Sequence, residues 1–234
     1  MKTVDFARLD LSPGARVLDL GCGEGRHALA LVHELPLRVI GADRSSAALS
    51  AAAAKARELP MHPEAELAWL CTDAMHLPLP DGSLDAVICS EVLEHLADPA
   101  GALAEIRRVL RPGAGRVALS VPRRWCERIC WELDPHYAFE PGGHVRIFRK
   151  RQLRRLAETE LGLRCTGSAG AHALHTPYWW LRSWFYRDWA DRASVQFWHG
   201  LLVRDLMQPR VWLRTLEGIL NPVMGKSIVL YFGP

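Results

Sequence analysis

Short apolar runs alternate with helix-type segments along most of the 234-residue chain. The runs have the length and the Val, Leu and Ile content of buried strands, and the segments between them place apolar residues at helical spacing or are rich in alanine. Strands that alternate with helices in this way predict a parallel sheet covered by helices on both faces. The predicted strands are residues 16–20, 37–42, 66–71, 84–89, 116–121, 163–169 and 227–232, and the predicted helices are a short lead-in before residue 13, 26–32, 46–59, 99–110, 123–133 and one that ends at 161.

A glycine-rich turn follows the first predicted strand. The strand contains Asp19, the turn contains Gly21, Gly23 and Gly25, and a helical pattern begins at Arg26. Glycines permit positive φ angles and a close approach to a ligand, and the N-terminus of the next helix favours an anionic or nucleoside-like molecule. A dinucleotide fingerprint has a third glycine at the position of Arg26, so the spacing disfavours NAD. Asp19 suits a cationic ammonium group better than a pyrophosphate, which it would repel.

Asp43 stands at the end of the second predicted strand, one strand–helix–strand crossover after Asp19. The carboxyl ends of parallel strands meet at one edge of the sheet, where ligands bind in open α/β folds. A carboxylate at that edge can accept hydrogen bonds from both ribose hydroxyls. Because NAD has the same ribose, Asp43 does not distinguish between the two kinds of cofactor.

Four segments resemble class I S-adenosylmethionine-dependent methyltransferases, and in particular the type 11 methyltransferase domain. They are Val-Leu-Asp-Leu-Gly-Cys-Gly-Glu-Gly at 17–25, the segment 73–85 that begins Asp-Ala-Met-His-Leu-Pro, Glu-Val-Leu-Glu-His-Leu at 91–96, and Leu-Arg-Pro-Gly-Ala-Gly-Arg at 110–116. They occur in the order found in the family. The resemblance covers roughly residues 14–165 and is weak beyond them.

The resemblance implies S-adenosylmethionine as cofactor and S-adenosylhomocysteine as product. It implies that Asp73 accepts a hydrogen bond from the adenine amino group and that the backbone amide of Ala74 meets the ring. It also implies an α/β fold, a seven-stranded, doubly wound, Rossmann-like sheet that is mostly parallel with an antiparallel last strand. With the residues at the strand ends, the expected cofactor-binding set is Asp19, Gly21, Gly23, Asp43, Arg44, Asp73, Ala74, Ser90 and Glu91.

Charge and composition narrow the class of partner. The net charge of +3 is too small for a protein whose affinity must come from neutralising phosphates, and the Asn/Asp-Pro-Pro-aromatic motif of base-modifying methyltransferases is absent, so nucleic acid is disfavoured. The six cysteines lack the spacing of metal sites, and we expect no metal. No apolar run reaches the ~20 residues of a membrane span, and no signal peptide is evident at the N-terminus. We therefore expect a cytoplasmic protein with a small-molecule substrate.

Tryptophan is concentrated late in the chain. Six of the nine tryptophans lie between residues 170 and 225, which predicts a methyltransferase core at 1–169, a helical, Trp-rich insert at 170–225 that covers the core and selects the substrate, and a last strand at 226–234. A helix from Tyr178 would place Leu181, Trp184, Phe185 and Trp189 on one face. The aromatic residues can pack on the sheet, line a pocket for a bulky, partly apolar substrate, or make a transient contact with a membrane surface.

Methyl transfer needs alignment of the two substrates, and it needs a base only when the acceptor atom carries a proton. His144 and His95 are the favoured bases because they stand beside the family-like segments, with His136 and Tyr137 as further candidates. The predicted function is methyl transfer to a small, bulky or partly apolar metabolite. A nicotinamide-dependent oxidoreductase and a non-catalytic adenosylmethionine-binding protein are the alternatives. The sequence leaves the acceptor atom, the substrate and the oligomeric state open.

Overall fold

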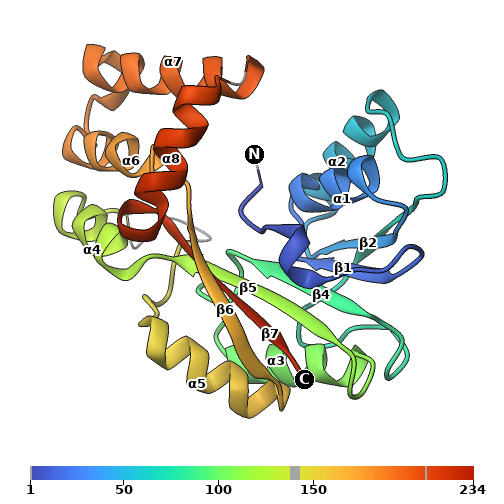
Figure 1. Cartoon of the computed structure of the whole chain (residues 1–234). Coiled ribbons are helices and arrows are strands. Elements are labelled where there is room, and N and C mark those ends of the chain that lie inside the picture. Colours follow the sequence, from blue (N-terminus) through green and yellow to red (C-terminus); the bar gives the residue numbers. More distant parts are fainter. Residues whose placement is uncertain (1, 138–142, 209) are drawn as a thin grey trace.

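The computed structural model describes residues 2–137, 143–208 and 210–234, and its centre is a seven-stranded sheet (Figure 1). The strand order is β3-β2-β1-β4-β5-β7-β6, and the pairs among β1 to β5 are parallel. Strand β7 is antiparallel to both β5 and β6, as predicted for the last strand. The strands are β1 Arg16–Leu20, β2 Arg38–Asp43, β3 Glu66–Cys71, β4 Ala86–Ser90, β5 Arg116–Pro122, β6 Arg164–Ala171 and β7 Ser227–Gly233.

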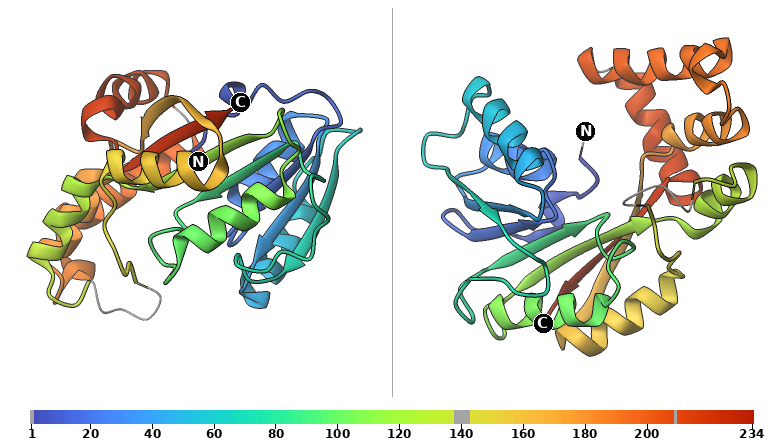
Figure 2. Two further views of the ribbon diagram at one scale, coloured as in Figure 1. Left: turned by 90° about the horizontal axis from the view of Figure 1, so that it is seen from below. Right: turned by 180° about the vertical axis from the view of Figure 1, so that it is seen from behind.

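Helices cover both faces of the sheet, so the predicted doubly wound α/β fold is confirmed. Successive residues of β1 show why both faces need cover. Val17 packs into the core on one face and Leu18 into the core on the other, and both are fully buried. Figures 1 and 2 show α1 and α2 on one side of the sheet and α3 and α5 on the other. The helices are α1 Arg26–Glu34, α2 Ser46–Glu58, α3 Pro99–Val109, α4 Arg124–Leu133, α5 Lys150–Leu161, α6 His175–Trp184, α7 Ala193–Met207 and α8 Val211–Met224.

Two helices begin at the capping residues expected from the sequence. The hydroxyl of Ser45 accepts a hydrogen bond from the amide of Ala48 at the start of α2. At the start of α3, the Asp98 carboxylate accepts from the amides of Ala100 and Gly101. Side chains of this kind satisfy amides that have no partner inside the first helical turn.

Two predicted helices are wrong in extent. The lead-in is a four-residue 3-10 helix, Phe6–Leu9, because Asp10 adopts a left-handed conformation (φ 49°) and ends it. The predicted helix through Trp189 ends at Trp184 instead, and Trp189 belongs to a second short 3-10 helix, Trp189–Asp191. Continuing α6 would have placed the charged Asp188 on its apolar face, whereas the break lets Asp188 pair with Arg192 near the surface.

Helices α6, α7 and α8 follow β6 and precede β7, so they lie beyond the carboxyl ends of the parallel strands together with α4, which follows β5 (Figure 1). Figure 2 shows these helices from two further sides, separate from α1 and α2. Strand β6 runs to Ala171, two residues past the predicted end. Among the described helices, none combines the length and the hydrophobicity that crossing a bilayer requires.

Helix α8 is fixed to the sheet by hydrogen bonds around Asn221. The side chain of Asn221 accepts from the amide of Ala173 at 2.9 Å, and its backbone carbonyl accepts from the Arg123 guanidinium at 3.1 Å. Gly170 in β6 lies directly against this carbonyl, because a Cβ atom added to Gly170 would stand 1.9 Å from the Asn221 oxygen. The absence of a side chain at Gly170 therefore sets how closely α8 approaches the sheet.

Candidate functional site

A pocket lies at the carboxyl ends of β1, β2, β3 and β4, where ligands of open α/β sheets bind. It unites residues that are far apart in the sequence, and six of the nine predicted cofactor-binding residues line it. The others in its wall include Val92, His95 and Leu96, from the segment after β4. The six predicted residues are Gly21, Asp43, Arg44, Asp73, Ala74 and Glu91.

The glycine turn and Asp43 are built as one unit. Gly21 has a φ of 69°, and a Cβ atom there would lie 2.2 Å from Cγ2 of Val92, so the turn accepts only glycine at this position. The Asp43 carboxylate accepts hydrogen bonds from the amides of Gly23 (2.8 Å) and Ser45 (2.9 Å). These bonds hold the carboxylate at the wall of the pocket in one orientation, as the bidentate contact predicted for a ribose requires.

Asp73 lies on the same wall, just beyond the end of β3. One of its carboxylate oxygens accepts from the amide of Met75 at 2.9 Å, which closes an Asx turn and sets the direction of the side chain. Ala74 follows in the lining. The geometry agrees with the predicted contacts to an adenine ring, and these contacts stay a prediction.

Three predicted cofactor residues are absent from the wall of this pocket. Asp19 is 1% exposed, and its carboxylate accepts from the amide of Ala28 at 2.9 Å. Its burial raises the pKa of this carboxyl to about 7, and the bond from Ala28 only partly offsets that effect. Ser90 is 7% exposed and shares a 2.8 Å hydrogen bond with Ser120, and Gly23 supports Asp43 from within the turn. Direct contact of these three residues with a cofactor stays a prediction.

Glu91 shows backbone strain at the wall of the pocket. It has a φ of 58°, which non-glycine residues rarely adopt. The hydroxyl of Ser120 donates to its carboxylate at 2.9 Å and holds the side chain in place. Strained residues of this kind cluster at functional sites, so the observation supports the prediction that Glu91 belongs to one.

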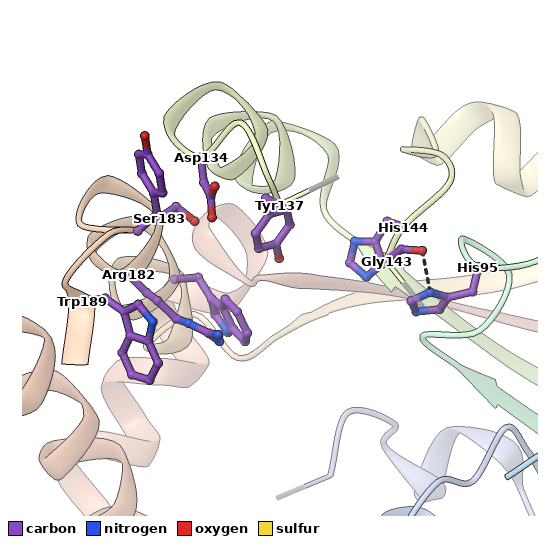
Figure 3. A pocket seen from close by; sticks show the side chains of 10 residues that line it. His95, Asp134, Tyr137, Gly143, His144, Arg182, Ser183 and Trp189 are labelled. Atoms are coloured by element: carbon purple, nitrogen blue, oxygen red, sulfur yellow. Dashed lines mark hydrogen bonds between the residues drawn. The ribbon is translucent and has the colours of Figure 1, made fainter. Parts of the chain in front are cut away.

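A second pocket, which we call the aromatic pocket, adjoins the first and shares His95 with it. Helix α6 and the segments after α4 and α6 supply its walls, so the Trp-rich insert does contribute to a cavity. Figure 3 shows Tyr137 between the Arg182 side and the His144–His95 side of this cavity. The aromatic pocket is lined by His95, Asp134, Tyr137, Gly143, His144, Trp179, Arg182, Ser183, Tyr186 and Trp189.

Arg182 places a positive charge in the wall of the aromatic pocket. Its guanidinium carbon lies 4.9 Å from the centre of the Trp179 ring and 4.7 Å from that of Trp189, between two indoles. A guanidinium held between aromatic rings keeps its edges for an anionic or oxygen-rich group. The helical spacing of Trp179, Arg182 and Tyr186 was a usable signal, because residues three and four apart share a face.

The tryptophans of the insert have different environments. Trp179 and Trp189 line the aromatic pocket. The indole of Trp180 donates to the carbonyl of Cys126 at 3.2 Å, and that of Trp198 donates to the carbonyl of Leu174 at 2.7 Å. Trp184 is 65% exposed, so the face expected to hold Leu181, Trp184 and Phe185 is open to solvent at this residue. The periodicity was right within α6, but the apolar face to which Trp184 was assigned is not covered at that end of the helix.

His95 lines both pockets, and His144 lies beside it in the aromatic pocket. A buried carboxylate, that of Glu127, bonds to His144. The rings of His95 and His144 are 4.8 Å apart, and Nδ1 of His144 donates to the carboxylate of Glu127, which is 1% exposed. Nδ1 of His95 donates to the carbonyl of Gly143 at 3.2 Å. Burial would raise the pKa of the Glu127 carboxyl, but the bond from His144 and the charge of Lys226 outweigh burial and lower it. A carboxylate that orients an imidazole in this way is typical of a general base.

Glu94 brings a second buried carboxyl group to the cluster of His95 and His144. It is 1% exposed, and within the described part of the chain neither oxygen of its carboxylate has a hydrogen-bond partner. Burial, followed by the nearby Glu91 and Glu127, raises the pKa of Glu94 well above its usual value. One ligand atom each of Glu94, His95 and His144 lie within 4.8 Å of one another, so these residues can also hold a divalent cation. No spacing signal had pointed to this set, because it joins two adjacent residues to a histidine far along the chain.

Comparisons with known proteins agree with the fold and with a methyltransferase domain in the first half of the chain. Residues 18–118 match the type 11 family model, whose description is methyltransferase domain. An uncharacterized protein in a transposon of Streptomyces fradiae is 46% identical over 123 residues, which are 52% of this chain and 34% of that protein. Demethylmenaquinone methyltransferase of Lactiplantibacillus plantarum is 43% identical over 117 residues, 49% of this chain and 48% of that enzyme. The chain thus spans half or less of the length of these relatives.

A solved structure resembles nearly the whole chain. The crystal structure described as the [4+2]-cyclase SpnF aligns with 97% of this chain and 77% of its own, with 24% sequence identity and a TM-score of 0.61. At this identity the similarity shows the fold alone. Because a fold hosts more than one chemistry, the function has to be argued from the site.

Proposed function

We propose that this chain transfers a methyl group from S-adenosylmethionine to a small molecule bound in the aromatic pocket, and the match of residues 18–118 to a methyltransferase domain supports the proposal. One observation carries the proposal: the family-type cofactor pocket and the aromatic pocket are adjacent and share His95. A methyl donor in the first pocket and an acceptor in the second would meet at this residue. In-line displacement requires such an alignment of donor, methyl carbon and acceptor.

The cofactor pocket suits an adenosine-containing molecule. Two backbone amides hold the Asp43 carboxylate at the wall of the pocket, where it would accept from a ribose, and Asp73 lies on the wall formed at the end of the neighbouring strand β3. The close approach at Gly21 keeps the turn compact beside them. S-adenosylmethionine, when bound, supplies an electrophilic methyl group on a sulfonium. The protein supplies orientation and a partly apolar wall that limits access of water.

The acceptor class follows from the walls of the aromatic pocket. Tyr137, Trp179 and Trp189 offer ring faces to a planar, partly apolar molecule, and Arg182 offers a fixed positive charge to an anionic or oxygen-rich substituent. The Lactiplantibacillus relative is named for a demethylmenaquinone, which supports a ring-containing acceptor. We propose a hydroxylated aromatic acceptor whose reacting atom lies next to His144.

His144 has two candidate roles, each supported by an observation. Its bond to the buried Glu127 supports general-base removal of the acceptor's proton. The unsatisfied carboxylate of Glu94 beside His95 and His144 supports a divalent cation that binds the acceptor oxygen. We favour the base, because the Glu127 bond already occupies Nδ1 of His144 and fixes the ring.

Calorimetric titration separates the proposed cofactor from the alternatives. S-adenosylhomocysteine should bind in a one-to-one complex, whereas NAD should show no saturable heat. Turnover with S-adenosylmethionine that carries a deuterated methyl group, offered with a set of hydroxylated aromatic compounds, should yield a product whose mass includes the label. Binding of S-adenosylhomocysteine without turnover on any of these acceptors would favour a non-catalytic protein or another acceptor class, and saturable binding of NAD would favour an oxidoreductase.

Asp43→Ala should weaken binding of S-adenosylhomocysteine by about 1.5–3 kcal/mol, the range for hydrogen bonds to a charged group. The substitution also removes the bonds from the amides of Gly23 and Ser45, so the turn loses its support. Asp81→Ala is a matched control, since the side chain of Asp81 is 80% exposed and lies outside the pocket. Equal affinity of the Asp43 variant and the unmodified protein would remove Asp43 from the cofactor site.

A further inference from the structure

The exposed large apolar side chains of this protein are concentrated on its late helices. Fourteen such side chains are exposed among the described residues, and ten of them lie between Trp184 and Val223. A soluble surface usually carries single, scattered apolar residues, and a concentration of them marks an interaction site. The ten are Trp184, Trp189, Phe197, Val203, Met207, Val211, Trp212, Leu216, Ile219 and Val223.

Helix α8 carries the most regular part of this surface. Trp212, Leu216, Ile219 and Val223 follow one another at spacings of four, three and four residues, which places them on one face of the helix. Their exposed fractions are 57%, 38%, 70% and 68%. A stripe with this spacing normally faces a core, but here it faces solvent. We call these four residues the α8 stripe.

The α8 stripe cannot turn inward, because the opposite side of α8 is already attached to the rest of the molecule. Leu213 is 2% exposed, and the Asn221 side chain accepts from the amide of Ala173. The hydroxyl of Thr176 in α6 donates to the carbonyl of Met224 at 2.7 Å. One face of the helix is therefore used in attachment, and the apolar stripe on the other face is exposed.

The charges near the α8 stripe indicate what it meets. Arg204, Arg210 and Arg214 are exposed around the corner where α7 ends and α8 begins. Two acidic side chains lie near these arginines. Asp205 accepts a hydrogen bond from the amide of Arg210, and burial raises the pKa of the Glu217 carboxyl. An apolar stripe with an exposed tryptophan and flanking arginines has the composition of a helix that lies in the interface of an anionic bilayer.

We propose that α7 and α8 bind the surface of a membrane that contains anionic lipids, with the α8 stripe buried among the headgroups and the exposed Arg204 and Arg210 at the phosphates. The proposed contact is peripheral, as for an amphipathic helix that lies in the headgroup region. Trp189 belongs both to the exposed set and to the lining of the aromatic pocket. The idea that the membrane contact delivers a lipid-soluble acceptor to the aromatic pocket rests on the proposed function.

Flotation with vesicles tests the contact without cofactor or acceptor, so its outcome is independent of whether methyl transfer is found. The protein should float with vesicles made of equal parts of phosphatidylcholine and phosphatidylglycerol, and less with phosphatidylcholine alone. Trp212→Ser together with Ile219→Ser should reduce partitioning about tenfold or more, because two apolar anchors are lost. Arg204→Gln and Arg210→Gln should each reduce it about fivefold on the anionic vesicles only.

The matched control is Leu59→Ser together with Met61→Ser, which removes two apolar side chains that are 49% and 37% exposed elsewhere on the molecule. This variant should float as the unmodified protein does, and all variants should keep the same melting temperature. Failure of the unmodified protein to float with either kind of vesicle would overturn the proposal. Sedimentation would then show whether the Trp212/Ile219 variant dissociates a dimer, which would assign the α8 stripe to contact between two copies of the chain.

Discussion

His144→Ala should slow methyl transfer by about 10²–10⁴-fold while affinity for S-adenosylhomocysteine stays unchanged. The range is the usual contribution of a positioned general base. His144 lines the aromatic pocket and not the cofactor pocket, so its loss should affect the chemical step and leave the cofactor in place. Single-turnover rates and calorimetric titration of the same preparations measure the two quantities separately.

His136→Ala is the control for this prediction. His136 was a candidate base from sequence, but its side chain is 77% exposed and it is absent from the lining of the aromatic pocket. Glu127→Gln should lower the rate less than His144→Ala, because the amide can still accept the hydrogen bond that orients the ring but no longer stabilises its positive charge. A His144→Ala variant that transfers methyl groups at the unmodified rate would exclude His144 from the reaction.

Chelation decides between the two roles of the histidine cluster. If His144 is a base, exhaustive treatment with EDTA should leave the rate of the unmodified protein as it was. Loss of activity that Mg²⁺ or Zn²⁺ restores would instead assign Glu94, His95 and His144 to a cation. In that case Glu94→Gln should weaken metal binding, which calorimetry with the metal alone would detect.

Gly170→Ala should destabilise the protein by about 3 kcal/mol, at the upper end of what an added methylene costs in a packed site. The new Cβ would meet the carbonyl oxygen of Asn221 at 1.9 Å and its carbon at 2.7 Å, and backbone atoms cannot move aside as a flexible side chain can. For a protein of this size, such a loss lowers the melting temperature by about 6–12 °C. Thermal unfolding followed by circular dichroism measures it.

Gly218→Ala in α8 is the matched control, because a Cβ there has nothing within 4 Å. Alanine is the better helix former, so this variant should unfold at the same temperature as the unmodified protein or slightly above it. If Gly170→Ala unfolds within a degree of the unmodified protein, α8 does not depend on close contact with β6. The docking of the late helices would then need a different explanation.

Much of the fold could be predicted because its determinants are local. A strand such as Arg16–Leu20 is recognisable from its own apolar residues, and the cap at Asp98 from its own side chain and the proline after it. The order of strands and helices then leaves few topologies for a doubly wound sheet. The cofactor pocket could be anticipated for the same reason, since Gly21, Asp43 and Asp73 stand at or just beyond strand ends that the sheet must bring together.

Only the tertiary structure shows which residues form the aromatic pocket, the proposed acceptor site. Helical spacing can indicate that Trp179 and Arg182 are neighbours on one helix, but the surroundings of a face depend on how distant segments pack, and only the structure places them in one pocket with His144. Packing likewise decided that Asp19 is buried and that Trp184 is exposed to solvent. The sequence by itself thus determined the sheet, its helices and the residues at its carboxyl edge, because each depends on neighbours in the chain. The aromatic pocket, the Glu127–His144 pair and the exposed α8 stripe depend on contacts between residues far apart in the chain, which no local pattern contains.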